Sequence, residues 1–75
     1  MQSIDPEIKE SLANVVNAMR DGNPARAESI CRDFLVINAA SVPHLQLLGH
    51  ALVRQDKFKE AKEQVEFALK IAPDY

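Results

Sequence analysis

The sequence is poor in the features that mark secreted, membrane-bound and nucleic-acid-binding proteins. It has a single cysteine, Cys31, so no disulfide can form within its 75 residues, and this usage suits a reducing compartment. Its formal net charge of −2 provides no clustered basic surface of the kind that nucleic acid requires. No apolar run is long enough to cross a bilayer, and the opening MQSIDPEIKE lacks the basic and apolar regions of a signal peptide. We therefore expect a cytoplasmic protein that binds neither membrane nor nucleic acid.

Proline and glycine are also few, and in the first half they stand where helices begin or end. The Asp-Pro pair at residues 5–6 combines an N-cap residue with proline at the first helical position. Gly22 is typical of the residue that closes a helix, and the Asn-Pro pair at 23–24 repeats the start signal. We expect a second helix from there to about residue 38.

The second half shows the same alternation. Ser41 predicts the cap of a third helix, whose apolar stripe is Leu45, Leu48 and Leu52 and which ends near Gln55. Asp56 predicts the cap of a fourth helix. The residues expected to face inward from it are Phe58, Ala61, Val65, Ala68 and Leu69. Since β-branched residues stand singly within helical periods, we expect no strand and a single all-α domain over residues 1–75.

The two halves also match one another at a spacing of 34 positions, the separation between Ala27 and Ala61. The same shift places Leu35 on Leu69, and it aligns the expected helix boundaries. A helix pair that recurs at this period is typical of stacked repeats.

The second half resembles a tetratricopeptide repeat, whose pattern is W-x2-L-G-x2-Y, then A-x3-F, then P. The matching residues are Leu45, Leu48, Gly49, Leu52, Ala61, Val65, Ala68 and Pro73. Leu45, Leu52 and Val65 stand where the pattern has aromatic residues. The resemblance implies two stacked antiparallel helix pairs of an α-solenoid, with repeats at about 6–39 and 41–74. In the first repeat Val15, Asn14 and Ala39 replace the glycine, leucine and proline of the pattern.

Gly49 lies inside a run of good helix formers, where glycine costs about 1 kcal/mol relative to alanine. The resemblance implies that Gly49 and Ala61 are the small residues at which two helices approach each other closely. We therefore expect packing to offset the low helix propensity of Gly49.

Residues that could carry catalysis or hold a cofactor are scarce. His44 and His50 are six positions apart, which places them on different sides of a helix, so we expect two partly exposed histidines and no metal site. Cys31 falls on an inward face, where a buried apolar role is expected rather than a reactive thiol. Because no nucleophile–base arrangement stands out either, we predict neither an enzyme nor a cofactor.

A binding surface remains, and the resemblance implies that the first helix of each repeat lines a concave groove. The groove residues carried over by position are Lys9, Leu12, Val16, Met19, Arg20, Gln46, His50, Val53 and Arg54. Leu12, Val16 and Met19 form an apolar ridge that the repeat core does not obviously use. The alternative is that the first helix is rotated and the ridge belongs to the core.

One binding mode of the family is not expected. Tetratricopeptide domains that hold the C-terminal carboxylate of chaperones use a lysine and asparagines, and the matching positions here are the apolar Leu12, Val16 and Leu47. Arg20 and Arg54 could still hold one carboxylate each across the groove.

Two functions are consistent with these features. The first is a protein–protein interaction module that binds a peptide or partner helix. The second is an accessory region of a multidomain bacterial sulfo- or glycosyltransferase, because the run AESICRDFL resembles the repeats that precede such catalytic domains. Solenoids need about three repeats, so we expect the amino-terminal part of a longer repeat protein. The wide apolar face of the last helix also predicts a weak homodimer through Val65, Phe67 and Leu69.

Overall fold

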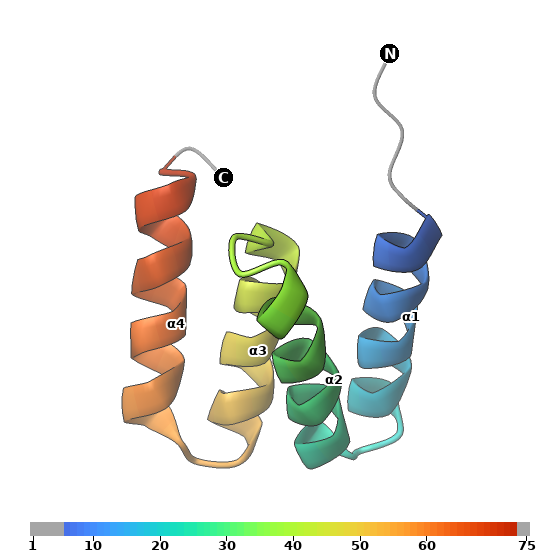
Figure 1. Cartoon of the computed structure of the whole chain (residues 1–75). Helices are drawn as coiled ribbons and strands as arrows, with labels where there is room; N and C mark the ends of the chain where they lie inside the picture. The colour runs from blue at the N-terminus through green and yellow to red at the C-terminus, as the bar shows by residue number, and fades with distance from the viewer. Residues whose placement is uncertain (1–5, 74–75) are drawn as a thin grey trace.

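The computed structural model describes residues 6–73, which form four helices that alternate in direction along the chain (Figure 1). The helices are α1 (Pro6–Arg20), α2 (Pro24–Ile37), α3 (Val42–Arg54) and α4 (Phe58–Ile71). No strand is present within this range, so the predicted all-α fold is confirmed. The expected cap at Asp5 and the expected end of the second repeat at residue 74 lie outside the described residues.

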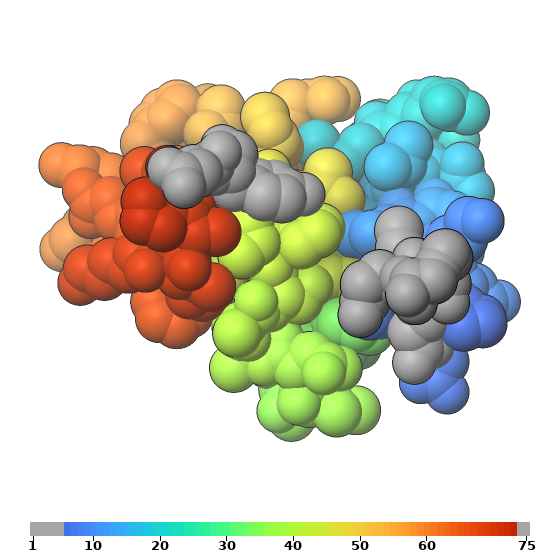
Figure 2. Space-filling model, turned by 90° about the horizontal axis from the view of Figure 1, so that it is seen from above, coloured from blue at the N-terminus to red at the C-terminus, as the bar shows by residue number. Residues whose placement is uncertain are grey.

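α3 is the central helix of the molecule. It packs against α2 and α4 and also contacts α1, whereas α4 packs on no described helix other than α3. Viewed from above, α3 lies between α4 and α1 (Figure 2). The buried members of the main core cluster are Val15, Ala18, Ala27, Cys31, Leu48, Ala51, Leu52 and Ala61. The predicted stripe of Leu45, Leu48 and Leu52 is buried, which confirms the inward face of α3.

The turn after α1 and the turn after α3 have the same backbone design, 34 positions apart. Gly22 has a φ of +75° and Asp56 has a φ of +63°. In the first turn the Asn23 N–H donates to the Ala18 carbonyl at 2.9 Å, and in the second the Lys57 N–H donates to the Leu52 carbonyl at 2.9 Å. Both turns therefore close a helix with one residue in the left-handed conformation.

This shared turn corrects the prediction that Asp56 caps the fourth helix. The N-cap of α4 is Lys57, whose side chain makes no capping hydrogen bond. Aspartate is favoured at N-caps but also tolerates the left-handed conformation, and here it serves the second purpose. Asp56 thus replaces the glycine that closes the first helix.

The other predicted caps lie at the expected positions. The Asn23 side chain accepts a hydrogen bond from the Arg26 backbone N–H at 3.2 Å. Ser41 is the N-cap of α3, but its hydroxyl does not bond the backbone. It bonds the His44 Nδ1 instead, at 2.7 Å. The N-cap of α3 is therefore held by the His44 side chain, which was expected from the sequence to be partly exposed.

The inward face predicted for α4 is only partly correct. Ala61 and Ala68 are buried, but Phe58, Val65 and Leu69 are largely exposed. The reason is that α4 has a single neighbouring helix, so α3 covers only a narrow stripe of it. An apolar period along α4 therefore continues onto a surface that no described part of the chain covers.

Candidate functional site

The predicted groove residues of α1 are partly exposed. Leu12 and Met19 are half-buried, and Val16 is 40% exposed. α4 does not reach α1, so the ridge is not covered from that side. Met19 nevertheless packs on the main core cluster. The ridge is thus shared between core and surface.

The predicted groove residues of α3 gather around a shallow hollow between α3 and α4. Its volume is about 350 Å³, and its lining consists of Gln46, Gly49, His50, Val53 and Val65. Three of these were predicted as groove residues, and the groove residues of α1 do not line it. Val65 was expected in the core, but in the structure it forms the α4 wall of the hollow. The sequence carries no signal for this, because the spacing of 34 positions places the buried Cys31 on Val65 and so also predicts a core position.

The ends of α1 and α3 carry two arginines in equivalent positions. Arg20 is the last residue of α1 and Arg54 is the last residue of α3, and both are exposed. Within residues 6–73 neither of them forms an ion pair. Both guanidinium groups therefore lie at the C-terminal ends of their helices, α1 and α3, without an ion-pair partner among the described residues.

His44 lies in a buried cluster and not at a partly exposed site, which corrects the prediction for this residue. Its ring is fully buried and stacks on the Phe34 ring, with centroids 3.9 Å apart and planes at 11°. The Ser11 hydroxyl lies 2.9 Å from Nε2, and the Ser41 hydroxyl lies 2.7 Å from Nδ1. Burial lowers the pKa of His44, because the charged form loses its hydration. The ring thus joins α1, α2 and the start of α3, whereas His50 is exposed.

Cys31 has the apolar role predicted for it. The side chain is fully buried within the main core cluster. Burial raises the pKa of the thiol to about 11, with the Arg32 charge opposing the shift only in part. The thiol is therefore protonated at neutral pH and is a poor nucleophile.

A cluster of charged and polar side chains links α2 to the end of α3. Glu28 accepts hydrogen bonds from Arg32 Nε at 2.7 Å, Gln55 Nε2 at 2.8 Å and Lys57 Nζ at 3.3 Å. Arg32 also donates to Glu60 at 3.2 Å. The hydrogen bond from Arg32 contributes most to holding the pKa of Glu28 below its ordinary value, against the opposing effect of burial. Sequence reasoning missed this cluster because its members come from three separate segments.

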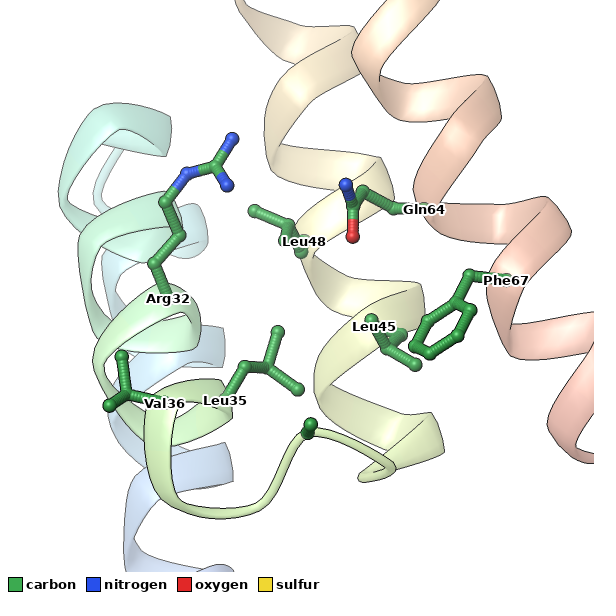
Figure 3. A pocket seen from close by; sticks show the side chains of 8 residues that line it. Arg32, Leu35, Val36, Leu45, Leu48, Gln64 and Phe67 are labelled. Atoms are coloured by element: carbon green, nitrogen blue, oxygen red, sulfur yellow. The ribbon is translucent and has the colours of Figure 1, made fainter.

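A second hollow, of about 370 Å³, lies between α2 and α4 on another side of α3 (Figure 3). Arg32 and Gln64 reach toward it from α2 and α4, and Leu45 and Leu48 lie between them. Phe67 forms part of its wall, so Phe67 and Val65 lie on different sides of α4.

The described part of the chain has neither a candidate metal site nor a candidate membrane-spanning helix. Among residues 6–73, no three His, Cys, Asp or Glu side chains are grouped so that they could hold a metal ion. None of the helices described is long and apolar enough to cross a membrane. Comparison with protein-family models, curated proteins and solved structures finds no match to this chain. What the chain does is therefore inferred from its own surfaces.

Proposed function

We propose that the chain is a protein-interaction module of the tetratricopeptide type, which binds a peptide or partner helix along α1 and α3. The proposed binding residues are the groove set predicted from the sequence: Leu12, Val16, Met19, Arg20, Gln46, His50, Val53 and Arg54. The observation that carries the α3 part of this surface is the hollow between α3 and α4, whose apolar wall of Val53 and Val65 stays exposed. The α1 part rests on the partial exposure of Leu12, Val16 and Met19. An exposed apolar hollow whose wall residue Val53 adjoins Arg54, which forms no ion pair within residues 6–73, suits an amphipathic partner with acidic groups.

The repeat architecture is supported by the equivalence of the two turns. A shift of 34 positions takes Pro24–Ile37 onto Phe58–Ile71, and it takes Gly22 onto Asp56. Such a helix pair stacked on its copy presents equivalent helices side by side, which builds extended binding surfaces.

A binding role is favoured over a catalytic one by the state of the two reactive side chains. The Cys31 thiol is buried and protonated, and both ring nitrogens of His44 are engaged by serine hydroxyls. Neither residue reaches the hollow. We therefore propose that the module itself is not an enzyme.

Selection of random peptides displayed on phage against the folded chain tests this function. Peptides that bind should lose at least about tenfold in affinity to Val53→Glu, because a charge would be introduced into the apolar wall. Ile37→Glu is the matched control, since Ile37 is 82% exposed on α2 and lines neither hollow. If no peptide is enriched, or if Val53→Glu binds as well as Ile37→Glu, the proposed function is wrong.

A further inference from the structure

The two repeats differ in how much of their surface is covered by another helix. The surface of the first repeat on which α3 sits has a counterpart in the second repeat, and no described residue covers that counterpart. We call this counterpart the open face. Its members, found by the shift of 34 positions, are Gln46, Gly49, His50 and Val53 on α3 and Phe58, Lys62, Val65 and Leu69 on α4.

The difference in burial is clearest on the second helix of each pair. Cys31 of α2 is fully buried, whereas its counterpart Val65 is 41% exposed. The side chain of Glu28 is 14% exposed, whereas that of its counterpart Lys62 is 76% exposed. The second repeat therefore lacks, among the described residues, the cover that α3 gives to the first.

The way α3 sits on the first repeat shows what such a helix must carry. At one end of α3, His44 contacts Ser11 and Phe34. At the other end, three turns later, the Gln55 amide donates to the Pro24 carbonyl at 3.4 Å and to Glu28 at 2.8 Å. Leu47, Leu48 and Ala51 lie between them on the same side of the helix and belong to, or pack against, the main core cluster. These five residues, four within α3 and Gln55 directly after it, are the docking face.

The open face differs from the seat of α3 at both ends, and each difference specifies a partner residue. The counterparts of Ser11 and Phe34 are Leu45 and Ala68, which are apolar and already buried, so that end offers no hydroxyl or aromatic ring to a polar side chain at the place of His44. The counterpart of Glu28 is Lys62, so the partner needs a carboxylate where α3 has Gln55. Lys62 is free to accept one, because its ion pair with Glu66 is 3.9 Å long and solvent-exposed.

We propose that the open face binds an amphipathic helix of a partner protein in the way that the first repeat holds α3. The partner helix carries apolar residues at the places of His44, Leu47 and Leu48, a small residue at the place of Ala51, and Asp or Glu at the place of Gln55. This inference rests on the proposed function, because Gln46, His50 and Val53 belong to both surfaces. It specifies a helix rather than an extended peptide, and it assigns the acidic contact to Lys62.

The probe is a synthetic, fluorescently tagged peptide of one helix on an alanine, lysine and glutamine background. It presents Leu, Leu, Leu, Ala and Glu at the spacing of the docking face. Fluorescence anisotropy measures its binding to the parent chain, to Val65→Asp and to Lys62→Glu, with Ile37→Glu as the matched control. Circular dichroism of each variant verifies folding, which is expected because Val65 and Lys62 are exposed.

We expect the peptide to bind the parent and Ile37→Glu alike and to lose at least about tenfold in affinity to Val65→Asp. Lys62→Glu should weaken binding by about threefold, the size of one exposed ion pair. A second peptide with Lys in place of its Glu should show the reverse preference and bind Lys62→Glu better than the parent. This exchange of charge does not depend on the stability of any one variant.

Three results would overturn the inference, and they separate it from the proposed function. If the phage-selected peptides need Val53 but the helical probe does not bind, the groove is real and its ligand is not this helix. If neither binds, both proposals fail. If the parent is already dimeric at the assay concentration and Val65→Asp makes it monomeric without any probe binding, the open face belongs to a second copy.

Discussion

Gly49 of α3 lies against Val65 of α4 so closely that a Cβ on residue 49 would come within 2.9 Å of Val65 Cγ2. The same Cβ would lie 3.7 Å from the Ala61 carbonyl oxygen. In the first repeat the equivalent residues are Val15 and Cys31, both fully buried in the main core cluster. The small residue is on α3 in one repeat and on α2 in the other, so the order of side-chain sizes is reversed between the two helix pairs.

Gly49→Leu should therefore destabilise the fold. The Cβ alone would come within 2.9 Å of Val65 Cγ2, so Val65 or α4 must move, and such overpacking costs about 1–3 kcal/mol. The loss outweighs the gain in helix propensity, which is about 1 kcal/mol. Thermal unfolding followed by circular dichroism measures it, and an unchanged midpoint would show that Gly49 is not at a helix contact.

The double variant Gly49→Ala with Val65→Ala provides the control for this explanation. Removing the Val65 methyl groups relieves the contact at 2.9 Å, and alanine restores helix propensity at residue 49. We expect the double variant to be at least as stable as Val65→Ala alone. A lower stability would mean that the glycine is needed for some reason other than the Val65 side chain.

The two left-handed turn residues predict stability changes of opposite sign. Gly22→Ala should destabilise by about 1 kcal/mol, because residue 22 has a positive φ and a Cβ there would meet nothing that could compensate. Asp56→Gly should stabilise by up to about 1 kcal/mol, since glycine adopts the same conformation without steric cost. Urea unfolding of both variants tests this, and two changes of the same sign would contradict it.

The sequence predicts the helices well because their ends are marked locally. Pro6, the pair at 23–24 and Gly22 mark helix ends by backbone chemistry that does not depend on distant contacts. Asp56 was misassigned because one residue type suits both an N-cap and a left-handed turn. Alignment with Gly22 at the shift of 34 positions distinguishes the two.

The predicted site was less complete, for a different physical reason. Apolar periodicity along α4 indicates which side of the helix is apolar but not whether another helix covers it, so Val65 was taken as core. His44 was taken as exposed because two of its partners, Ser11 of α1 and Phe34 of α2, meet α3 only in the folded chain. Contacts of this kind carry no local signal.

Burial of His44 makes the stability depend on pH. Burial lowers its pKa in the folded state, and the positive end of α3 also disfavours a cation there. The unfolded chain, with an ordinary histidine pKa of about 6.5, then binds more protons than the folded chain. The free energy of unfolding should therefore fall as the pH drops from about 7 toward the folded-state pKa.

Urea unfolding between about pH 7.5 and pH 5 measures this fall, with His44→Gln as the reference. Glutamine can still hydrogen-bond the serine hydroxyls but does not titrate, so its profile should be flatter over this range. Equal slopes for the parent and His44→Gln would show that the ring is protonated in the folded chain as easily as in the unfolded one.

The cluster around Glu28 predicts a second, more acidic transition. Glu28 joins α2 to Gln55 and Lys57, and its carboxylate is mostly buried. Glu28→Ala should cost about 1–2 kcal/mol at pH 7, since it removes hydrogen bonds to a charged acceptor. Because the folded-state pKa is lowered, this contribution is present above the ordinary value of 4.5 and is lost as the pH falls through the folded pKa.

Asp33→Ala is the matched control for Glu28. Asp33 lies on the same helix, is exposed, and forms no hydrogen bond or ion pair within the described residues. Its removal should change the stability by no more than about 0.5 kcal/mol. If Asp33→Ala and Glu28→Ala destabilise equally, the loss reflects the charge of the helix and not the contacts of Glu28.

An uncovered apolar face also predicts self-association. Val65 and Leu69 are both exposed on the open face, whereas Phe67 lies at the other hollow and should take no part. A two-fold contact would bury these side chains against their own copies, with a gain of about 25 cal/mol per Å² of apolar surface. The cost of association, at least several kcal/mol, offsets most of this gain. We expect a monomer in dilute solution and a weak dimer at high concentration.

Sedimentation over a concentration series tests this expectation, with Leu69→Glu and Phe67→Glu compared against the parent. Leu69→Glu should abolish the dimer, because two like charges would meet across the two-fold axis, and Phe67→Glu should leave it unchanged. The helical probe should also dissociate the dimer, since both would occupy the open face. A parent that stays monomeric at high concentration would contradict the prediction. A dimer that survives Leu69→Glu but not Phe67→Glu would instead place the contact at the hollow between α2 and α4.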